Sequence, residues 1–126
     1  MRKVISSGAP WEDIVGYSRA VQVNNQIEIA GTTATKNGEI QFPGDAYQQT
    51  KCILSIFENA LKELGASMDD VVRTRIFVTD IKQWEDIGRA HGAYFKDIKP
   101  ATTMVEVSAL IDPELVVEIE ASAIIG

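Results

Sequence analysis

The side chains that most often carry chemistry are scarce in this chain of 126 residues. His91 is the only histidine and Cys52 the only cysteine, so a zinc site built from one histidine and two cysteines is excluded. A serine–histidine–aspartate triad would have to use His91, which has no flanking signature, and we expect His91 to lie on a helix surface. Cys52 falls within a predicted helix, where packing is its expected role. Gly31-Thr32-Thr33 is too short to be a phosphate-binding loop.

Catalysis by this chain would therefore depend on carboxylates, hydroxyls, arginines and backbone groups. These groups suit the addition of water to a substrate that is already reactive. Such a reaction needs positioning and a modest proton transfer more than it needs a strong nucleophile.

The composition is that of an ordinary globular protein, with 45% hydrophobic and 24% charged residues, and we expect one domain over residues 1–126. The formal net charge of −6 argues against broad binding to nucleic acid, because phosphate binding needs a basic surface. A single cysteine excludes an intramolecular disulfide and fits a reducing compartment. Neither a signal peptide nor a membrane-spanning stretch is recognisable. We expect a soluble, cytoplasmic protein with no membrane partner.

Turn residues and hydrophobic spacing divide the chain into elements in the order β-β-α-β-α-β-β. Asn24-Asn25 joins the first two strands, Lys36–Glu39 forms another turn, and Asp45 is a good N-cap for a helix that ends at Gly65. The predicted strands are 17–23, 26–30, 71–78, 102–107 and 116–123, and the predicted helices are about 46–64 and 82–95.

Two helices can cover only one face of such a sheet, so the fold class is α+β, a single mixed sheet with two helices packed on one face. Alternation along the last three strands predicts which residues lie under the helices: Val72, Thr74, Ile76 and Val78; Thr103, Val105 and Val107; Val117, Ile119, Ala121 and Ala123. The opposite face would carry a mixture of charged and apolar groups: Arg73, Arg75 and Phe77; Thr102, Met104 and Glu106; Val116, Glu118 and Glu120. A mixed face of this kind is either an oligomer interface that lines a wet cleft or a solvated surface with cross-strand Arg–Glu pairs.

Three segments resemble the YjgF/Rid (reactive-intermediate deaminase) family, in matching order over nearly the whole chain. The first is Gly16-Tyr17-Ser18-Arg19-Ala20-Val21. The second is Asp70-Val71-Val72-Arg73-Thr74-Arg75-Ile76-Phe77-Val78-Thr79-Asp80. The third is Pro100-Ala101-Thr102-Thr103-Met104-Val105-Glu106-Val107, followed by Val117-Glu118-Ile119-Glu120-Ala121.

The resemblance implies a chorismate-mutase-like fold and a homotrimer with three clefts between subunits. Characterised members hydrolyse enamines and imines to keto acids and ammonia without metal or cofactor, and others have been linked to RNA cleavage or ligand sensing. We therefore expect an inter-subunit cleft for a small anionic metabolite, with hydrolysis of a reactive enamine or imine as the leading hypothesis. The alternative is a non-catalytic binding or regulatory protein, and a weaker one is an endoribonuclease.

Individual residues carry over by position. Tyr17 matches the family's cleft tyrosine, Gly31 the glycine whose backbone lines the site, and Glu118 the carboxylate thought to hold the attacking water. The alternative is that Glu118 has no catalytic role and is a solvated or ion-paired strand residue. Tyr17, Ala30, Gly31, Thr102, Thr103 and Met104 are the expected lining of the cleft.

Four positions depart from the deaminase pattern. Thr102 stands where the family has its key arginine, Met104 replaces a cysteine, Ala30 a serine and Gly88 an asparagine. A guanidinium binds a carboxylate through two parallel hydrogen bonds, which threonine cannot do. We therefore expect weak activity on the usual 2-imino acids. Arg19, on the same strand face as Tyr17, and Arg75 are the candidates to replace the lost arginine, although Arg19 could instead pair with a carboxylate.

Overall fold

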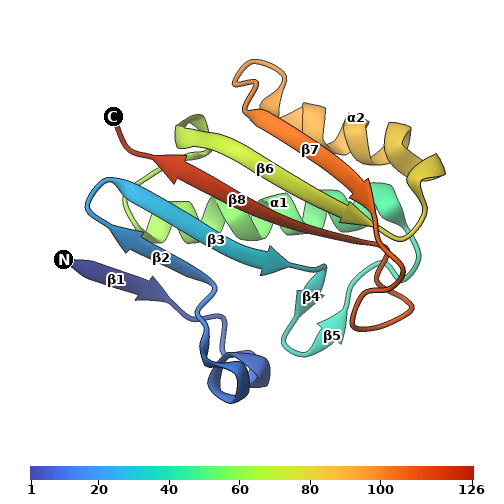
Figure 1. Ribbon diagram of the computed structural model, residues 1–126, viewed down its shortest axis with the longest axis horizontal. Coiled ribbons are helices and arrows are strands. Elements are labelled where there is room, and N and C mark those ends of the chain that lie inside the picture. The colour runs from blue at the N-terminus through green and yellow to red at the C-terminus, as the bar shows by residue number, and fades with distance from the viewer.

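The computed structural model describes residues 1–126 and is built on a six-stranded sheet with the strand order β1-β2-β3-β8-β6-β7 (Figure 1). The strands are β1 (Arg2–Ile5), β2 (Ala20–Val23), β3 (Gln26–Thr32), β6 (Val71–Val78), β7 (Ala101–Glu106) and β8 (Val117–Ile124). All neighbours are antiparallel except β6 and β7, which are parallel. A separate two-stranded hairpin consists of β4 (Thr35–Lys36) and β5 (Glu39–Ile40).

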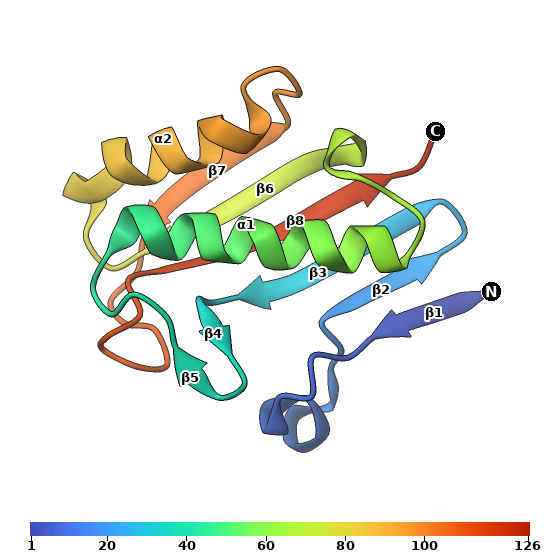
Figure 2. The same ribbon diagram turned by 180° about the vertical axis from the view of Figure 1, so that it is seen from behind.

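Both long helices, α1 (Ala46–Glu63) and α2 (Trp84–Phe95), lie on the same face of the sheet (Figure 2). Short helical turns occur at η1 (Glu12–Gly16), η2 (Met68–Asp70) and η3 (Ile81–Gln83). The side chain of Asp45 accepts a hydrogen bond from the backbone N–H of Gln48 at 3.0 Å, so the predicted cap is present. The predicted α+β fold, a mixed sheet with two helices on one face, is confirmed. None of the helices is long and apolar enough to cross a membrane.

The core lies between the helices and the sheet and fixes the orientation of β8. Ile53 and Phe57 of α1 are fully buried together with Ile119 of β8. Burial of each such side chain stabilises the fold by about 1.5–3 kcal/mol. Val117, Ile119, Ala121 and Ala123 all face the helices, as the alternation predicted. Glu118 and Glu120 must therefore point to the open face of the sheet.

A buried amide ties the loop before α1 to the segment that leads into β8. Nε2 of Gln49 donates to the carbonyl oxygens of Phe42 at 3.1 Å and Glu114 at 2.9 Å. Oε1 of Gln49 accepts from the backbone N–H of Val116 at 3.0 Å. Because Gln49 is fully buried, these bonds hold the start of β8 in place.

The predicted faces of β6 and β7 were partly wrong. The register of β6 against β8 shifts between Val71 and Arg73, so Val71 takes the buried position and Val72 is 43% exposed. In β7 the whole prediction was inverted: Thr102 pairs with the buried Thr74 and, with Met104 and Glu106, lies on the helix face.

It follows that Thr103, Val105 and Val107 belong to the open face and not under the helices. An edge strand with similar residues on both sides carries little information about its orientation, and a shift of one residue reverses every side chain.

The sequence also missed β1. Its four residues pair with β2 from Arg2↔Val23 to Ile5↔Ala20, which makes β1 an edge strand. The first predicted strand begins at Ala20 and not at Tyr17, and the backbone N–H of Arg19 instead donates to the carbonyl of Ile5 at 2.8 Å. This contact brings Arg19 beside the N-terminal segment.

Candidate functional site

Glu118 and Gly31 approach each other closely where β3 pairs with β8. The register between these strands shifts between Ile29 and Thr32, which displaces Gly31 toward its neighbour. A Cβ atom added to Gly31 would lie 2.5 Å from Oε2 of Glu118, closer than real Cβ contacts come. Unless Glu118 shifts, only glycine fits here, and the Glu118 carboxylate lies directly against the backbone of β3.

The surroundings of Glu118 favour its protonated form more than water does. The side chain is half-buried, and burial raises its pKa; the neighbouring Glu120 carboxylate raises it further, while the charge of Arg19 opposes both. Glu118 borders a cavity of about 280 Å³. The other residues around this cavity are Gly31, Phe77, Val107, Ala109, Leu110 and Glu120. A carboxylate with a raised pKa beside partly apolar walls is suited to general acid–base work.

Arg19 is buried behind this carboxylate, with 8% of its surface exposed. Its Nη1 donates to the carbonyl of Gly31 at 2.8 Å and to Oγ1 of Thr32 at 2.9 Å. Its Nη2 lies 3.5 Å from the Tyr17 hydroxyl, and its guanidinium carbon lies 5.5 Å from the centre of the Tyr17 ring. Arg19 thus holds Tyr17 and the Gly31 backbone in one arrangement.

A buried carboxylate, Glu12, completes this set of contacts. Oε2 of Glu12 lies 3.9 Å from Nη2 of Arg19, and Oε1 accepts from the Ser6 hydroxyl at 2.8 Å. The backbone N–H and the hydroxyl of Ser7 also donate to Glu12. Burial alone would raise the pKa of Glu12, but the bonds from Ser7 and Ser6 and the charge of Arg19 outweigh it and lower the pKa.

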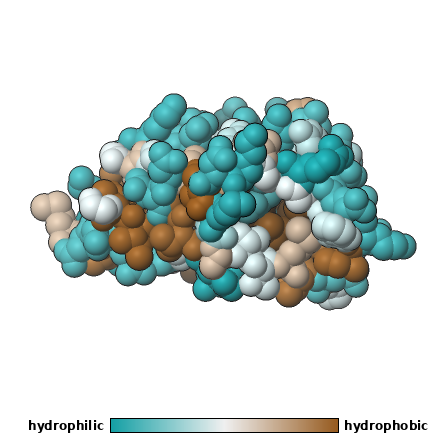
Figure 3. Space-filling model, turned by 90° about the horizontal axis from the view of Figure 1, so that it is seen from above, coloured by the Kyte–Doolittle hydropathy of each residue, from teal (hydrophilic) through white to brown (hydrophobic).

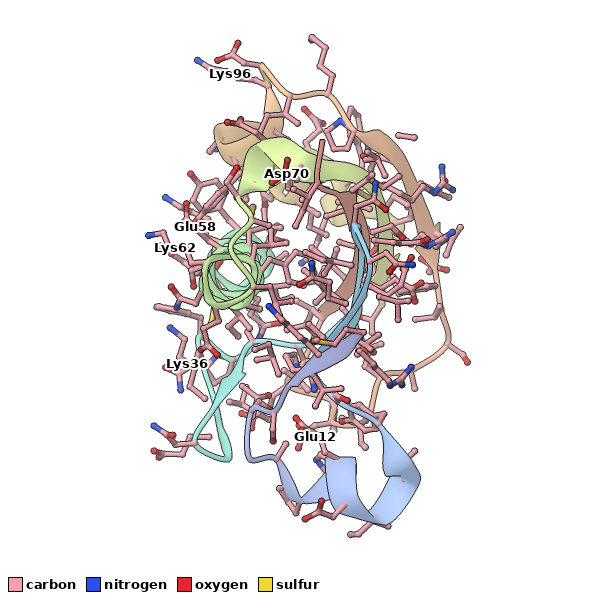
Figure 4. The ribbon with its side chains drawn as sticks, turned by 90° about the vertical axis from the view of Figure 1, so that its left-hand side faces the viewer. Glu12, Lys36, Glu58, Lys62, Asp70 and Lys96 are labelled. Atoms are coloured by element: carbon pink, nitrogen blue, oxygen red, sulfur yellow. The ribbon has the colours of Figure 1, made fainter.

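Figure 4 shows Glu12 where the N-terminal turn meets the end of the sheet. Nothing in the spacing of the sequence marked Glu12 or the two serines. A wider hollow of about 620 Å³ lies beside these residues, and its lining includes Glu12, Tyr17, Ala30, Gly31 and Glu120. We call Glu12, Tyr17, Arg19, Gly31 and Glu118 the Glu118 cluster.

Arg75, the second arginine singled out from the sequence, forms an ion pair on the open face. Its Nη1 lies 3.3 Å from Oε2 of Glu120, with both side chains more than a third exposed. Such a pair contributes little to stability. Thr103 lies on the same face, where its hydroxyl accepts from Nη2 of Arg73 at 2.8 Å.

Thr102 and Met104 lie apart from the Glu118 cluster, on the other face of the sheet. The hydroxyl of Thr102 is 2.8 Å from that of Thr74, which in turn is 2.9 Å from Nε2 of His91 on α2. His91 is half-buried against Phe95, with 4.7 Å between ring centres, and burial lowers its pKa. The predicted surface position of His91 is therefore only partly right, because the ring packs against Phe95 and bonds to Thr74 while part of it stays exposed. Cys52 is buried within α1, and burial raises the pKa of its thiol, in keeping with the predicted packing role.

Within one chain, the structure thus brings together Tyr17, Arg19, Ala30, Gly31 and Glu118 but leaves Thr102 and Met104 elsewhere. No three histidine, cysteine, aspartate or glutamate side chains converge as they would around a metal ion.

Comparison with known proteins places the whole chain in one family. The family model described as Endoribonuclease L-PSP matches residues 8–125. A RutC family protein of Pyrococcus abyssi is 34% identical over 124 residues, which are 97% of this chain and 96% of that protein. A solved structure from Mycobacterium tuberculosis, a member of the YjgF/YER057c/UK114 family, is 46% identical and has a TM-score of 0.91, covering 99% of this chain and 100% of that one. The structure of YyfA from Yersinia pestis, of the Rid protein family, is 32% identical with a TM-score of 0.87, covering 99% and 100%. With sequence and fold matching over nearly its full length, this chain belongs to the YjgF/Rid family.

Proposed function

We propose that this protein hydrolyses a small reactive imine or enamine without a cofactor, with Glu118 as the general base. The observation that carries the proposal is the half-buried Glu118 carboxylate with its raised pKa, held against Gly31 beside a small cavity. Glu118 takes a proton from water while the water oxygen bonds to the imine carbon. The same proton then passes to the nitrogen, which gives a carbinolamine. Glu118 next transfers the proton of the carbinolamine hydroxyl to the nitrogen, the carbon–oxygen double bond forms as the carbon–nitrogen bond breaks, and a ketone or aldehyde and ammonia leave. A positioned base of this kind contributes about 10²- to 10⁴-fold to the rate.

The charges around Glu118 bear on which substrate fits. The sequence predicted an anionic ligand, held by Arg19 or Arg75. Arg19 is buried and donates to Gly31 and Thr32, and Arg75 is paired with Glu120. A carboxylate on the ligand would have to compete with Glu120 for the exposed Arg75, whereas a protonated imine would be attracted to Glu118. We therefore propose that the substrate is recognised through its nitrogen and needs no carboxylate.

The proposed assembly is a homotrimer whose clefts lie between subunits, as the resemblance implied. The open face of the sheet supports it, because Val4, Val23, Val105 and Ile124 are more than 40% exposed there beside charged residues. The view from above looks at the molecule from the α2 side and not onto the open face, and hydrophobic groups lie there too in separate patches among hydrophilic ones (Figure 3). Sedimentation equilibrium at micromolar concentration should give three times the chain mass of 13.8 kDa, and a monomeric mass would refute the assembly.

The test of the activity is ammonia release from freshly generated imines, with and without a carboxylate group. Glu118→Gln should lower kcat/KM at least about a hundredfold, while Glu58→Gln, on α1, should leave it unchanged. Equal rates for wild type and Glu118→Gln would refute the assignment of Glu118.

Ligand binding with no turnover of any imine would instead support the alternative, a non-catalytic binding or regulatory protein. Ribonuclease activity is disfavoured by the net charge of −6 and by the engagement of Arg19 and Arg75.

A further inference from the structure

Three polar side chains form a continuous hydrogen-bonded chain at the β7 edge of the sheet, beneath α2. Nε2 of His91 lies 2.9 Å from the Thr74 hydroxyl, and the Thr74 hydroxyl lies 2.8 Å from the Thr102 hydroxyl. The Thr102 hydroxyl is also 3.2 Å from the carbonyl oxygen of Pro100, to which it donates. We call His91, Thr74 and Thr102 the edge triad.

Burial of the Thr74 hydroxyl, in the middle of this triad, costs desolvation free energy. Thr74 is fully buried, and its only side-chain partners are His91 and Thr102. A valine of the same shape would fill the site without placing a hydroxyl in the core, and a buried hydroxyl at best offsets its desolvation through its hydrogen bonds. Stability therefore does not by itself require the triad, although its bonds join α2 to β6 and β6 to β7.

Both ends of the edge triad open to solvent. Thr102 is exposed on the edge strand. At the other end, Nδ1 of His91 has no hydrogen-bond partner in the protein and is not fully buried. A buried hydroxyl thus links two accessible polar atoms.

Two positions of α2 close to His91 are glycines and carry no side chain. Gly88 and Gly92 are one turn apart on α2 and flank His91, and a Cβ atom added to either would meet nothing within 4 Å. Glycine inside a helix costs about 1 kcal/mol relative to alanine, and here no neighbour in the chain requires it. The surface of α2 next to the triad is therefore open.

The direction of the hydrogen bonds decides what a small molecule bound here must offer. Thr102 has one proton, which it donates to the carbonyl oxygen of Pro100. The Thr74 hydroxyl must therefore donate to Thr102, and Nε2 of His91 to Thr74, which leaves Nδ1 of the neutral ring as an acceptor. The proton of Thr102 is thus used inside the protein, and both ends of the triad, the Thr102 oxygen and Nδ1 of His91, offer acceptors.

We propose that the edge triad binds a neutral group that donates a hydrogen bond, such as a carboxamide, and discriminates against a carboxylate. A carboxylate has no proton to give and would have to displace the bond from Thr102 to Pro100. The inference rests on the proposed function only in assigning this group to the substrate, since binding at the triad requires no catalysis.

The test uses propanamide and propanoate, a neutral donor and an anion of matched size, in NMR titrations of the full-length protein. The wild type should bind propanamide more tightly, with shifts at the His91 ring nitrogens and the Thr102 methyl. Thr102→Val and His91→Phe, which keeps a ring against Phe95, should each weaken propanamide binding roughly three- to tenfold and leave propanoate unaffected. The control Thr35→Val, in the β4–β5 hairpin, should change neither.

Tighter binding of propanoate by the wild type, or propanamide binding that is unchanged in both triad variants, would overturn the inference. Dissociation of the oligomer by His91→Phe, measured by sedimentation, would do so too, because it would assign the triad to a subunit contact. Loss of propanamide binding in Thr102→Val, combined with no hydrolysis of any imine by the wild type, would refute the proposed function and leave the triad standing.

Discussion

Replacing Gly31 with alanine tests the arrangement between β3 and β8 directly. The new Cβ atom would lie 2.5 Å from Oε2 of Glu118, whereas ordinary contacts begin at 3.4 Å, so the carboxylate must move by about 0.9 Å. The atom that must give way is the end of a flexible side chain, and Gly31 does not have the positive φ that would make alanine strained. The loss in unfolding free energy should therefore stay within about 1.5 kcal/mol, the order of a displaced rotamer.

The effect on catalysis should be larger than the effect on stability. A displacement of about 1 Å in a reacting group can lower the rate about a hundredfold, which corresponds to about 2.7 kcal/mol in the activation free energy. We expect Gly31→Ala to lower kcat/KM for imine hydrolysis by this factor, with KM changing less than kcat. Thermal unfolding and sedimentation of the same preparation would show whether the fold and assembly are kept.

A double variant shows whether Gly31 acts through Glu118. If it does, Gly31→Ala combined with Glu118→Gln should be no slower than Glu118→Gln alone, because the base whose position Gly31 protects is already gone. Losses that multiply in the double variant would mean that Gly31 has a separate role. Full activity of Gly31→Ala would refute the idea that the close approach matters.

Three further predictions concern the groups that hold the site together. Arg19→Met should lower the unfolding free energy by about 3 kcal/mol, because Glu12 loses its buried partner. The same variant should move the acid limb of the kcat/KM profile to higher pH, since Arg19 lowers the pKa of Glu118. An acid limb that stays in place would contradict this. The pKa of Glu12 is lower in the folded state, so its contribution to stability is present above the unfolded pKa and is lost as the pH falls through the folded pKa. In urea titrations at acid pH, wild type should therefore lose this contribution to its unfolding free energy, whereas Glu12→Gln should not. Gln49→Leu should cost about 2–4 kcal/mol in chemical denaturation, because it leaves buried backbone partners unpaired, and a cost below about 1 kcal/mol would show that water replaces the amide.

The parts of the fold that sequence alone could predict are those with strong periodicity or a local signal. Ile53 and Phe57 recur at helical spacing in α1, and Asp45 caps that helix. In β8 the apolar and acidic residues alternate without a break, so the outward position of Glu118 followed directly. In these segments one face is fully buried, and the hydrophobic effect leaves only one orientation.

The errors fall where burial is weak or where a partner is distant in the sequence. β7 is an edge strand with little difference between its faces, so only pairing with β6 decides that Thr102 points toward α2. His91 could not be matched with Thr74 before the register was known. The burial of Arg19 depends on Glu12 and on the bulge at Gly31, neither of which leaves a pattern in the sequence.

The position of the edge triad has a consequence for how the protein would work. Thr102 points to the helix face of β7, whereas Glu118 points to the open face of β8, and β6 lies between these two strands. The two groups therefore cannot contact one small molecule within a single chain. If both act on the same substrate, Thr102 of one subunit must meet Glu118 of another, and hydrolysis then requires the assembled oligomer. Dilution below the dissociation constant of the assembly should accordingly abolish turnover, while propanamide should still bind at the edge triad of the separated chain, because Thr102 and His91 remain in place.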